Sequence, residues 1–242
     1  MNLAVDIGNT QVKLGVFDGE EMILQRPVHA NEFDEALDLI LKTHNIRQTI
    51  ICATGNSEKI ATSIKDRGLS VSVLDQKTPV PFKNLYETPQ TLGVDRIALM
   101  AGAAHKFAGS NVLVIDAGTC ITYDFLNKQN EYLGGAIAPG VSMRYKAMHE
   151  FTHALPLLSF TKSEKPYGAN TQQAMHAGVF TGLIAEIDAQ MDWYKSNYER
   201  LKIVLTGGDV QFLSNSLKND IFADSNFLLQ GLNYILLFNT HQ

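Results

Sequence analysis

The sequence predicts an α/β fold built from two similar halves, each a mixed sheet with helices. Strand-like apolar runs alternate with segments of helical periodicity along most of the 242 residues, an order typical of sheets covered by helices. A strand, a turn and a second strand open the chain, and the same pattern recurs near its middle. The length fits one large domain or two closely packed ones, because domains usually hold about 100–200 residues.

The first half is predicted to open with a β-hairpin, because two short apolar strands flank the tight turn from Asp6 to Thr10. Helical spacing of apolar residues follows Asn31 and again Ser57, and both residue types cap helices. Gly68 is expected to end the second of these helices. The predicted strands of this half are residues 3–5, 12–17, 49–53 and 69–74.

A long loop and a helix close the first half. Residues 76–93 hold several prolines and show little periodicity, and loops of this length in a compact domain are usually functional or disordered. A helix is predicted over residues 94–107, and it ends at an Ala-Gly-Ser sequence. The boundary is therefore placed near residue 109, with an N-terminal half 1–109 and a C-terminal half 110–242.

The second half repeats the opening of the first. In both, an apolar strand ends in Asp, a Gly follows two residues later with a Thr nearby, and a new strand begins, as from Asp6 to Thr10 and from Asp116 to Thr119. This duplication predicts a ligand cleft between the halves. The other elements expected here are strands at 112–115, 121–125 and 201–205, a turn at 134–140, and helices that end near 153 and span 171–197 and 227–238.

Composition and charge exclude several classes of function. The net charge is −5, the sequence pI is about 5.8, and no run is rich in Lys or Arg, so no nucleic acid is expected as a partner. The amino terminus lacks the features of a signal peptide, and no stretch holds the ~20 apolar residues that span a bilayer. A cytoplasmic protein without a membrane partner is expected. Cys52 and Cys120 lie in apolar runs without metal-ligand spacing, which predicts reduced core residues.

The turn after the first strand has the chemistry of a phosphate site. Backbone N–H groups, the Asn9 amide and the Thr10 hydroxyl gather there, and such groups suit phosphate oxygens. Asp6 is placed to hold Mg²⁺ through water, because Mg²⁺ prefers carboxylate oxygens and keeps several waters while it bridges to phosphates. A single Asp-Gly turn is weak evidence, but its recurrence from Asp116 to Thr119 favours phosphate binding.

Three charged positions have alternative interpretations. Lys13, on the strand that leaves the first turn, either supplies a cation for phosphates or is a solvated surface lysine. Asp95 and Arg96 open the helix after the long loop. Asp95 is either a partner of the helix dipole, worth about 0.3–1 kcal/mol, or the group that accepts a proton from an alcohol. In the second case Arg96 binds a carboxylate or hydroxyl of the substrate.

Four motifs together resemble type III pantothenate kinase, a family of the acetate and sugar kinase, heat-shock protein 70 and actin superfamily. They are Asp-x-Gly-Asn-Thr from Asp6, Gly-x-Asp-Arg from Gly93, Asp-x-Gly-Thr from Asp116 and Thr-Gly-Gly-Asp from Thr206. Each is common alone, but Gly-x-Asp-Arg shortly before Asp-x-Gly-Thr is specific to this family within the superfamily. The resemblance spans nearly the whole chain, and it implies a duplicated actin-like, or ribonuclease H-like, fold.

The resemblance also implies an activity, which is ATP-dependent phosphorylation of pantothenate to 4′-phosphopantothenate in coenzyme A biosynthesis, by a homodimer. It implies Asp95 as catalytic base, Mg²⁺ as cofactor, and Asp116 as ligand of a monovalent cation, K⁺ or NH₄⁺. The residues implied to bind the nucleotide are Asp6, Ile7, Gly8, Asn9, Thr10, Gln11, Val12, Lys13 and Thr119. Those implied to bind pantothenate are Tyr86, Gly93, Val94, Asp95, Arg96 and Thr171.

Several positions have plainer alternatives. Tyr86 would otherwise be a loop aromatic that covers the core, and Thr171, which the resemblance places across a subunit interface, would otherwise cap the long helix. Cys120 stands where the family usually has alanine, and its modest volume is not expected to disturb binding. His149 and His153 would share one helical face and suggest a metal pair, but without a third ligand they are expected to be surface or packing histidines.

Two rival functions stay open at this point. Another small-molecule kinase of the superfamily, such as a sugar kinase, would differ in its acceptor. A non-catalytic nucleotide-binding accessory protein would keep the scaffold without turnover, but the intact Asp6, Asp95, Arg96 and Asp116 argue against it.

Overall fold

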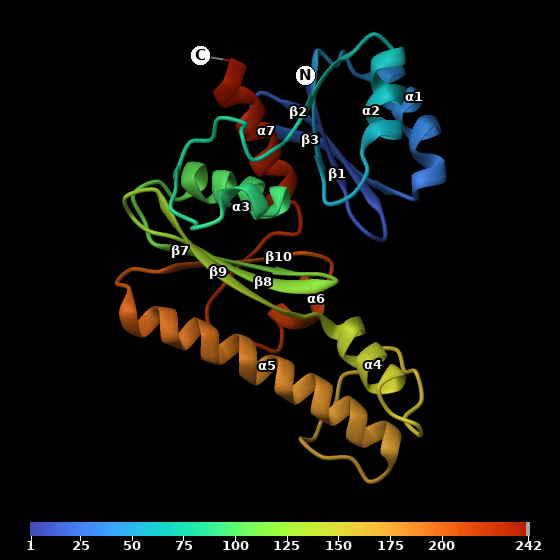
Figure 1. The fold of residues 1–242 in the computed structure, drawn as a ribbon, viewed down its shortest axis with the longest axis vertical. Helices are drawn as coiled ribbons and strands as arrows, with labels where there is room; N and C mark the ends of the chain where they lie inside the picture. The colour runs from blue at the N-terminus through green and yellow to red at the C-terminus, as the bar shows by residue number, and fades with distance from the viewer. Residues whose placement is uncertain (241–242) are drawn as a thin grey trace. The chain divides into compact units, whose positions relative to one another are not determined.

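The computed structural model describes residues 1–240, which divide into two compact units (Figure 1). The first unit comprises residues 1–109, 126–134 and the C-terminal segment from Asn226, and the second comprises 110–125 and 135–225. Each contains hydrogen-bonded strands and its own apolar core, as the alternation of strands and helices predicts. Within residues 1–240, no helix is long and apolar enough to cross a bilayer.

A five-stranded sheet in the order β3-β2-β1-β4-β5 forms the centre of the first unit. Its strands are β1 (Asn2–Ile7), β2 (Val12–Asp18), β3 (Glu21–Val28), β4 (Gln48–Ala53) and β5 (Ser70–Val73). β1 is antiparallel to β2 and parallel to β4. The predicted hairpin is therefore present, and its register places Asp6 opposite Lys13.

Helices cover both faces of this sheet (Figure 1). On one face, α1 (Phe33–Thr43) and α2 (Glu58–Asp66) bury Leu37 and Ile64 against Leu3 of β1. All three side chains are fully buried, and burial of such a side chain contributes about 1.5–3 kcal/mol. The helical periodicity of the sequence predicts this packing, because it places the apolar residues of each helix on one side.

α3 (Val94–Lys106) and α7 (Phe227–Thr240) pack against each other and against the other face of the sheet. Glycines allow their backbones to approach closely, since Gly102 meets Gly231 and a Cβ on Gly231 would overlap the carbonyl oxygen of Ala98. This packing fixes the helix whose first turn carries Asp95.

The strands of the second unit follow the order β11-β10-β7-β8-β9. Their bounds are β7 Val112–Ala117, β8 Cys120–Leu126, β9 Glu131–Pro139, β10 Lys202–Thr206 and β11 Phe222–Ala223. β10 runs parallel to both β7 and β11. The short β6 (Lys83–Asn84) pairs in parallel with the first two residues of β9, and these four residues all belong to the first unit.

The long helix α5 (Thr171–Asn197) has the bounds that the sequence predicts. With α4 (Val141–Glu150) and α6 (Val210–Ser214) it completes the second unit. One side of α5 buries Leu183 and Ile187 in the core. The other side exposes mostly small residues, namely Ala174, Gly178, Thr181, Gly182, Ala185 and Ala189.

The structure corrects two local predictions. Asn31 does not cap the first helix, because it lies in a 3-10 turn in which the N–H of His29 donates to Glu32 Oε2 at 3.0 Å. Residues 134–140 form the end of β9 and the start of α4 rather than a turn. The left-handed backbone of Gly134, with φ of 121°, is a local irregularity inside an otherwise extended strand.

Two features of the first unit escape the sequence prediction. β3 is an edge strand that mixes charged residues and a proline, which edge strands tolerate. The second helix begins after Ser57 as predicted, but the side chain that accepts a helix N–H is Asn56, whose Oδ1 lies 2.8 Å from the N atom of Glu58.

Candidate functional site

Asp6 and Lys13 form the charged centre of the first predicted phosphate turn. They lie opposite each other in the hairpin, and the N–H of Gly8 closes the turn by donating to the Gln11 carbonyl at 3.1 Å. Residues 8–10 are exposed, whereas Lys13 is half-buried. The Lys13 charge lowers the pKa of the Asp6 carboxyl, and a role of Lys13 at phosphates stays a prediction.

The Asp6 carboxyl has an unusual protonation equilibrium. Burial raises its pKa from an ordinary 3.8 to about 6, Lys13 lowers the pKa, and Asp95 raises it. Burial has this effect because a low-dielectric surrounding disfavours the charged form. Lys13 and Asp95 therefore lie near enough to act on the Asp6 carboxyl, and the three residues form one electrostatic cluster.

Asp95 lies in the first turn of α3, which Gly93 precedes as N-cap residue. Its Oδ1 accepts the N–H of Arg96 at 2.8 Å, and a Cβ on Gly93 would overlap the same oxygen. Gly93 therefore leaves room for a carboxylate that folds over the helix start. The helix-dipole interpretation agrees with this hydrogen bond, but Asp95 also acts on Asp6, so the two interpretations do not exclude each other.

Tyr86 is held between two side chains of the first unit. The guanidinium carbon of Arg96, a residue 5% exposed, lies 5.5 Å from the centroid of the Tyr86 ring, which is within the range of a cation–π contact. The ring of Tyr132 stacks on Tyr86 with centroids 6.0 Å apart. A Cβ on Gly134 would lie 3.6 Å from the Tyr86 ring.

Tyr132 is a candidate that sequence reasoning misses. It is fully buried, and its ring stacks on the ring of Tyr86. Its position depends on the pairing of β6 with β9, which brings residues 83–84 beside 131–132. Its only sequence signal is that an aromatic residue stands just before the glycine-rich residues 134–140, which the sequence predicts to be a turn.

The second predicted phosphate turn lies between β7 and β8. The N–H of Gly118 donates to the Cys120 carbonyl at 3.0 Å, and Thr119 at the tip is exposed. Gly140, which precedes α4, donates its N–H to the Thr119 carbonyl at 3.1 Å, and a Cβ on Gly140 would overlap the Gly118 carbonyl oxygen. Gly140 therefore packs directly against the turn, and any other residue type at this position would displace the turn. Cys120 is half-buried rather than a full core residue.

The Thr206-to-Asp209 motif packs against the end of the Asp116 strand. Gly207 has a left-handed backbone with φ of 99°, and a Cβ there would overlap the Ala117 carbonyl oxygen. The N–H of Asp209 donates to that carbonyl at 3.1 Å. Burial raises the pKa of the Asp209 carboxyl. Sequence reasoning names this motif without a role, and the structure makes Asp209 a further candidate site residue.

Thr171 opens α5 but does not cap it. The cap is Asn170, whose Oδ1 accepts the N–H of Gln173 at 2.9 Å. The capping alternative for Thr171 is therefore wrong, and Thr171 is exposed.

The predicted histidine pair does not form on one helical face. His149 lies in the last turn of α4, with Nδ1 2.8 Å from the Leu155 carbonyl oxygen, and His153 lies beyond the helix end. Both are exposed. In the part of the chain that the structure describes, no group of three or more His, Cys, Asp or Glu side chains is placed to hold a metal.

The first turn fits an Mg²⁺ ion bound through water. Mg²⁺ usually takes one or two carboxylates and completes its shell with water and substrate phosphates. Asp6 offers one desolvated carboxyl with a raised pKa, and a nearby cation favours its ionised form.

Most of the predicted residues adjoin others of their own unit, whereas Thr171 lies apart at the start of α5. Within the first unit, Asp6, Lys13 and Asp95 form one cluster, and Tyr86 and Arg96 are in contact. Within the second, the Asp116 strand, the Thr119 turn and the Thr206 motif adjoin one another. The predicted cleft between the halves stays a prediction.

Known proteins similar to this chain agree in their description. A model of the type III pantothenate kinase family matches residues 2–192. Relatives described as type III pantothenate kinases from Flavobacterium johnsoniae, Christiangramia forsetii and Bacteroides fragilis are 44%, 43% and 40% identical to it. The alignments cover 96%, 100% and 99% of this chain, and 96%, 100% and 98% of the relatives.

Solved structures show the same fold at low sequence identity. A Campylobacter jejuni protein described as a Baf family transcriptional activator has a TM-score of 0.65 and 22% identity, covering 99% of this chain and 100% of that one. A ROK family glucokinase from Streptomyces griseus, solved with glucose and AMPPNP, has a TM-score of 0.54 and 14% identity, with coverage of 100% and 99%. This likeness confirms the duplicated actin-like fold, and the family match confirms the resemblance that the four motifs indicate. The chain belongs to the type III pantothenate kinase family.

Proposed function

We propose that this chain transfers the γ-phosphoryl group of ATP to the primary hydroxyl of pantothenate, giving ADP and 4′-phosphopantothenate, the first step of coenzyme A biosynthesis. The observation that carries the proposal is the cluster of Asp6, Lys13 and Asp95, in which a candidate base lies within electrostatic reach of a candidate phosphate turn. Membership of the family supports the choice of acceptor.

Asp95 is the proposed base. Its Oδ1 accepts the Arg96 N–H, which orients the carboxylate and leaves Oδ2 to receive the hydroxyl proton. The acceptor oxygen forms a bond to the γ-phosphorus while the bond to the bridging oxygen of ADP breaks, and the proton passes to Asp95. Phosphoryl transfer depends mainly on positioning and electrostatic stabilisation. The base must therefore be held beside the acceptor hydroxyl.

The two turns are proposed to hold the ATP phosphates. Residues 6–13 offer backbone N–H groups, the Thr10 hydroxyl and the half-buried Lys13 ammonium, and Thr119 offers a second hydroxyl. When bound at Asp6, Mg²⁺ neutralises charge on the phosphates. The positive charge of Lys13, which lowers the pKa of Asp6, also offsets part of the repulsion between the Asp6 carboxylate and an anionic nucleotide.

Pantothenate is proposed to lie against Gly93, Val94, Arg96 and Tyr86, with Thr171 contributed by a partner subunit. Arg96 is buried and contacts the Tyr86 ring, so its guanidinium is oriented before substrate binds. A planar fork of N–H donors suits a carboxylate or a pair of hydroxyl and carbonyl oxygens, and pantothenate carries all three groups.

A monovalent cation, K⁺ or NH₄⁺, is proposed at Asp116. Asp116 ends β7 and is half-buried beside the Gly207 turn. A carboxylate that faces triphosphate oxygens without an intervening cation would be repelled, so an ion between them is needed to keep it charged.

A homodimer through the exposed side of α5 is also proposed. This side is lined by small residues, and a groove of about 470 Å³ lies along it, bordered by Lys165, Thr181, Ala185 and Ala189. Small residues allow helices to approach closely, and a second copy supplies a helix of the same shape. The segment before α5 also exposes large apolar side chains that a partner subunit could cover: Phe151, Leu157 and Tyr167. The cytoplasm, where ATP is available, is the compartment that this reaction implies.

A coupled ADP-release assay tests the proposed function. Purified protein with ATP and Mg²⁺ is offered pantothenate, and in parallel glucose and N-acetylmannosamine, each with and without K⁺. The expected result is that ADP is released with pantothenate and not with glucose or N-acetylmannosamine. Turnover of a sugar instead would establish a different small-molecule kinase, and ATP binding without turnover of any acceptor would establish an accessory protein.

A further inference from the structure

We propose that Arg144 is a positioning residue that holds the second phosphate turn, Gly118–Thr119, in place through the backbone of Pro139 and Gly140. The inference rests on the proposed role of Thr119 and deepens it, because it assigns a function to an ion-pair network outside the four motifs.

Arg144 connects three elements of the second unit. It lies one turn into α4, where its Nε donates to the Pro139 carbonyl at 2.9 Å and its Nη2 donates to Glu186 Oε2 on α5 at 2.6 Å. The other Glu186 oxygen, Oε1, accepts the hydroxyl of Tyr123 on β8 at 3.1 Å. The planar guanidinium thus donates through two separate N–H groups to two elements. A lysine ammonium does not reproduce this geometry.

The Glu186 end of the network is partly buried against the core, whereas the Pro139 end is exposed. Tyr123 is 1% exposed, and the side chains of Arg144 and Glu186 are 21% and 32% exposed. Burial, and after it the Glu186 charge, raises the pKa of the Tyr123 hydroxyl. The two part-buried hydrogen bonds of Glu186 are expected to be stronger than those of an exposed pair.

At the Pro139 end of the network, the next residue, Gly140, contacts the phosphate turn. Gly140 donates its N–H to the Thr119 carbonyl at 3.1 Å, and a Cβ at this position would overlap the Gly118 carbonyl oxygen. The contact is backbone against backbone, so no flexible side chain absorbs a displacement. A shift of Pro139 therefore moves the turn that is proposed to carry Thr119 to the phosphates.

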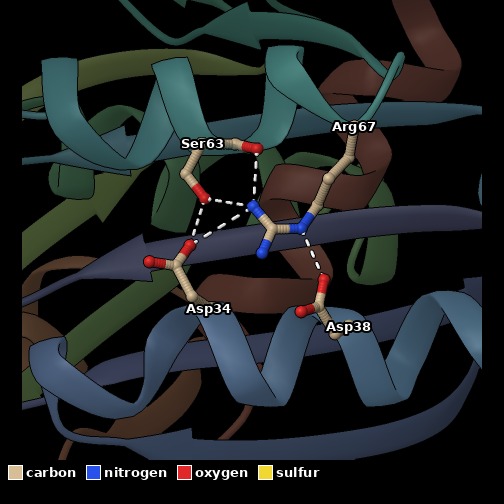
Figure 2. A network of polar contacts seen from close by, with 4 residues as sticks. All are labelled: Asp34, Asp38, Ser63 and Arg67. Atoms are coloured by element: carbon tan, nitrogen blue, oxygen red, sulfur yellow. Dashed lines mark hydrogen bonds and ion pairs between the residues drawn. The ribbon is translucent and has the colours of Figure 1, made fainter.

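The chain offers a matched control network that is remote from the motifs. Arg67, just after α2, donates from Nε to Asp38 at 2.6 Å and from Nη1 to Ser63 Oγ at 2.7 Å, and it pairs with Asp34 at 3.3 Å (Figure 2). Its side chain is 24% exposed, close to the 21% of Arg144. Loss of Arg67 removes a comparable set of hydrogen bonds without a link to either turn.

The test compares Arg144→Ala, Arg144→Lys and Arg67→Ala in the intact protein, by steady-state kinetics, ATP titration calorimetry and thermal melting. Arg144→Ala is expected to raise the KM and Kd for ATP about tenfold and the KM for pantothenate less than about twofold, since small misplacements of positioning groups have large effects. Arg144→Lys keeps the charge facing Glu186 and is expected to recover part of the ATP affinity. Arg67→Ala is expected to leave ATP affinity unchanged even if it lowers the melting temperature.

Two results would overturn the inference: unchanged ATP affinity in folded Arg144→Ala, or equal losses in Arg144→Ala and Arg67→Ala. If Arg144→Ala does not fold, Arg144→Lys decides by the same criterion. Thr119→Ala tests separately the proposed role of Thr119, on which the inference rests. Unchanged ATP affinity in that variant would remove the turn from the nucleotide site, whatever the effect of Arg144→Ala. A variant lacking both Arg144 and Glu186 side chains, Arg144→Ala with Glu186→Ala, should lose no more ATP affinity than Arg144→Ala alone if the two act as one unit.

Discussion

Asp6 and Asp95 are two carboxylates of one electrostatic cluster with different surroundings. Asp6 is desolvated at the end of a buried strand, with a pKa of about 6, while Asp95 accepts a backbone N–H at the start of α3. Different environments commonly give two acidic residues of one site different tasks. In the proposed mechanism Asp6 binds the cation and Asp95 is the base, an assignment that the motif resemblance supplies.

Asp95→Asn is expected to lower kcat by about 10²–10⁴, the usual contribution of a positioned acid–base group. An amide has nearly the same shape as the carboxylate, and its oxygen still accepts the Arg96 N–H, so α3 should begin as before. Steady-state kinetics and a thermal melt measure the two effects separately. Near-normal turnover of the folded variant would remove Asp95 from the role of base.

The raised pKa of Asp6 predicts a pH-dependent stability difference between the wild type and Asp6→Asn. The folded pKa lies above the unfolded one, so the stabilising contribution of Asp6 is complete below pH ~4 and is lost as the pH rises through ~6. At pH 8 without nucleotide, Asp6→Asn should therefore be more stable than the wild type, by at most about 3 kcal/mol for a shift of this size.

Urea unfolding at pH 4, 6 and 8 measures this difference, which should shrink toward low pH. Catalysis should show the opposite preference. Activity of the wild type should fall as the pH drops below about 6, and more Mg²⁺ should move this acid limb to lower pH, because a cation favours the ionised carboxylate. An acid limb that ignores the Mg²⁺ concentration would contradict the proposed cation site.

Asp116 is expected to make the enzyme depend on K⁺ or NH₄⁺. A site sized for a larger ion binds Na⁺ poorly, so Na⁺ should activate weakly, and Asp116→Ala should lose monovalent activation altogether. Initial rates in matched chloride salts at constant ionic strength measure the effect. Equal rates in Na⁺ and K⁺, with the variant unaffected, would restrict Asp116 to Mg²⁺ or to the turn itself.

At the scale of elements, helix packing positions the site. α3 carries Asp95 and Arg96 in its first turn, and its position depends on the close crossing with α7 at Gly102 and Gly231. α7 comes last in the chain and yet belongs to the first unit. The position of Asp95, the proposed base, therefore depends on a helix that follows the entire second unit in the sequence.

Gly231→Ala is expected to destabilise the protein by about 1–3 kcal/mol, the usual cost of overpacking, because its Cβ would overlap the Ala98 carbonyl oxygen. Chemical unfolding measures this loss, and kcat should fall as α3 shifts. Gly55→Ala is the control, since a Cβ there would meet no atom of the described residues within 4 Å. Equal stability of the two variants would show that α3 and α7 adapt to the extra methyl group.

At the scale of the whole molecule, the site is proposed to need a partner subunit. Thr171 is exposed at the start of α5, and the small-residue side of the same helix is exposed along Gly178 and Gly182. A Cβ at either glycine would meet no atom of the described residues within 4 Å in a single chain. A second copy packed on this side would bring its own Thr171 helix with it.

Gly178→Leu combined with Gly182→Leu should give a folded monomer with little activity, as measured by light scattering and the ADP assay. Mixing Thr171→Ala with Asp95→Asn tests the shared site independently. If Thr171 acts across the interface, random exchange of subunits yields hybrid dimers with one intact site, and about a quarter of the wild-type activity should return. A mixture no more active than its components, after exchange is verified by mass, would refute a shared site.

Local chemistry determined much of this protein from sequence alone. The strand-turn-strand pattern, the Asp-Gly turns and the bounds of α5 follow from apolar periodicity and from the residues that form turns, and both depend on neighbours in the chain. The motif spacing also identified the family, because Gly93-x-Asp-Arg and the Asp116 turn report on chemistry that few sequences combine.

Only the tertiary structure decided contacts between segments far apart in the chain. It placed Tyr132 under Tyr86, Arg144 between Pro139 and Glu186, and α7 against α3, none of which has a local signal. It also showed that the glycine-rich residues after Gly134 form a strand, since pairing partners rather than intrinsic preference decide β structure. The pKa of Asp6 has the same origin, because it depends on burial and on charges that the fold brings near.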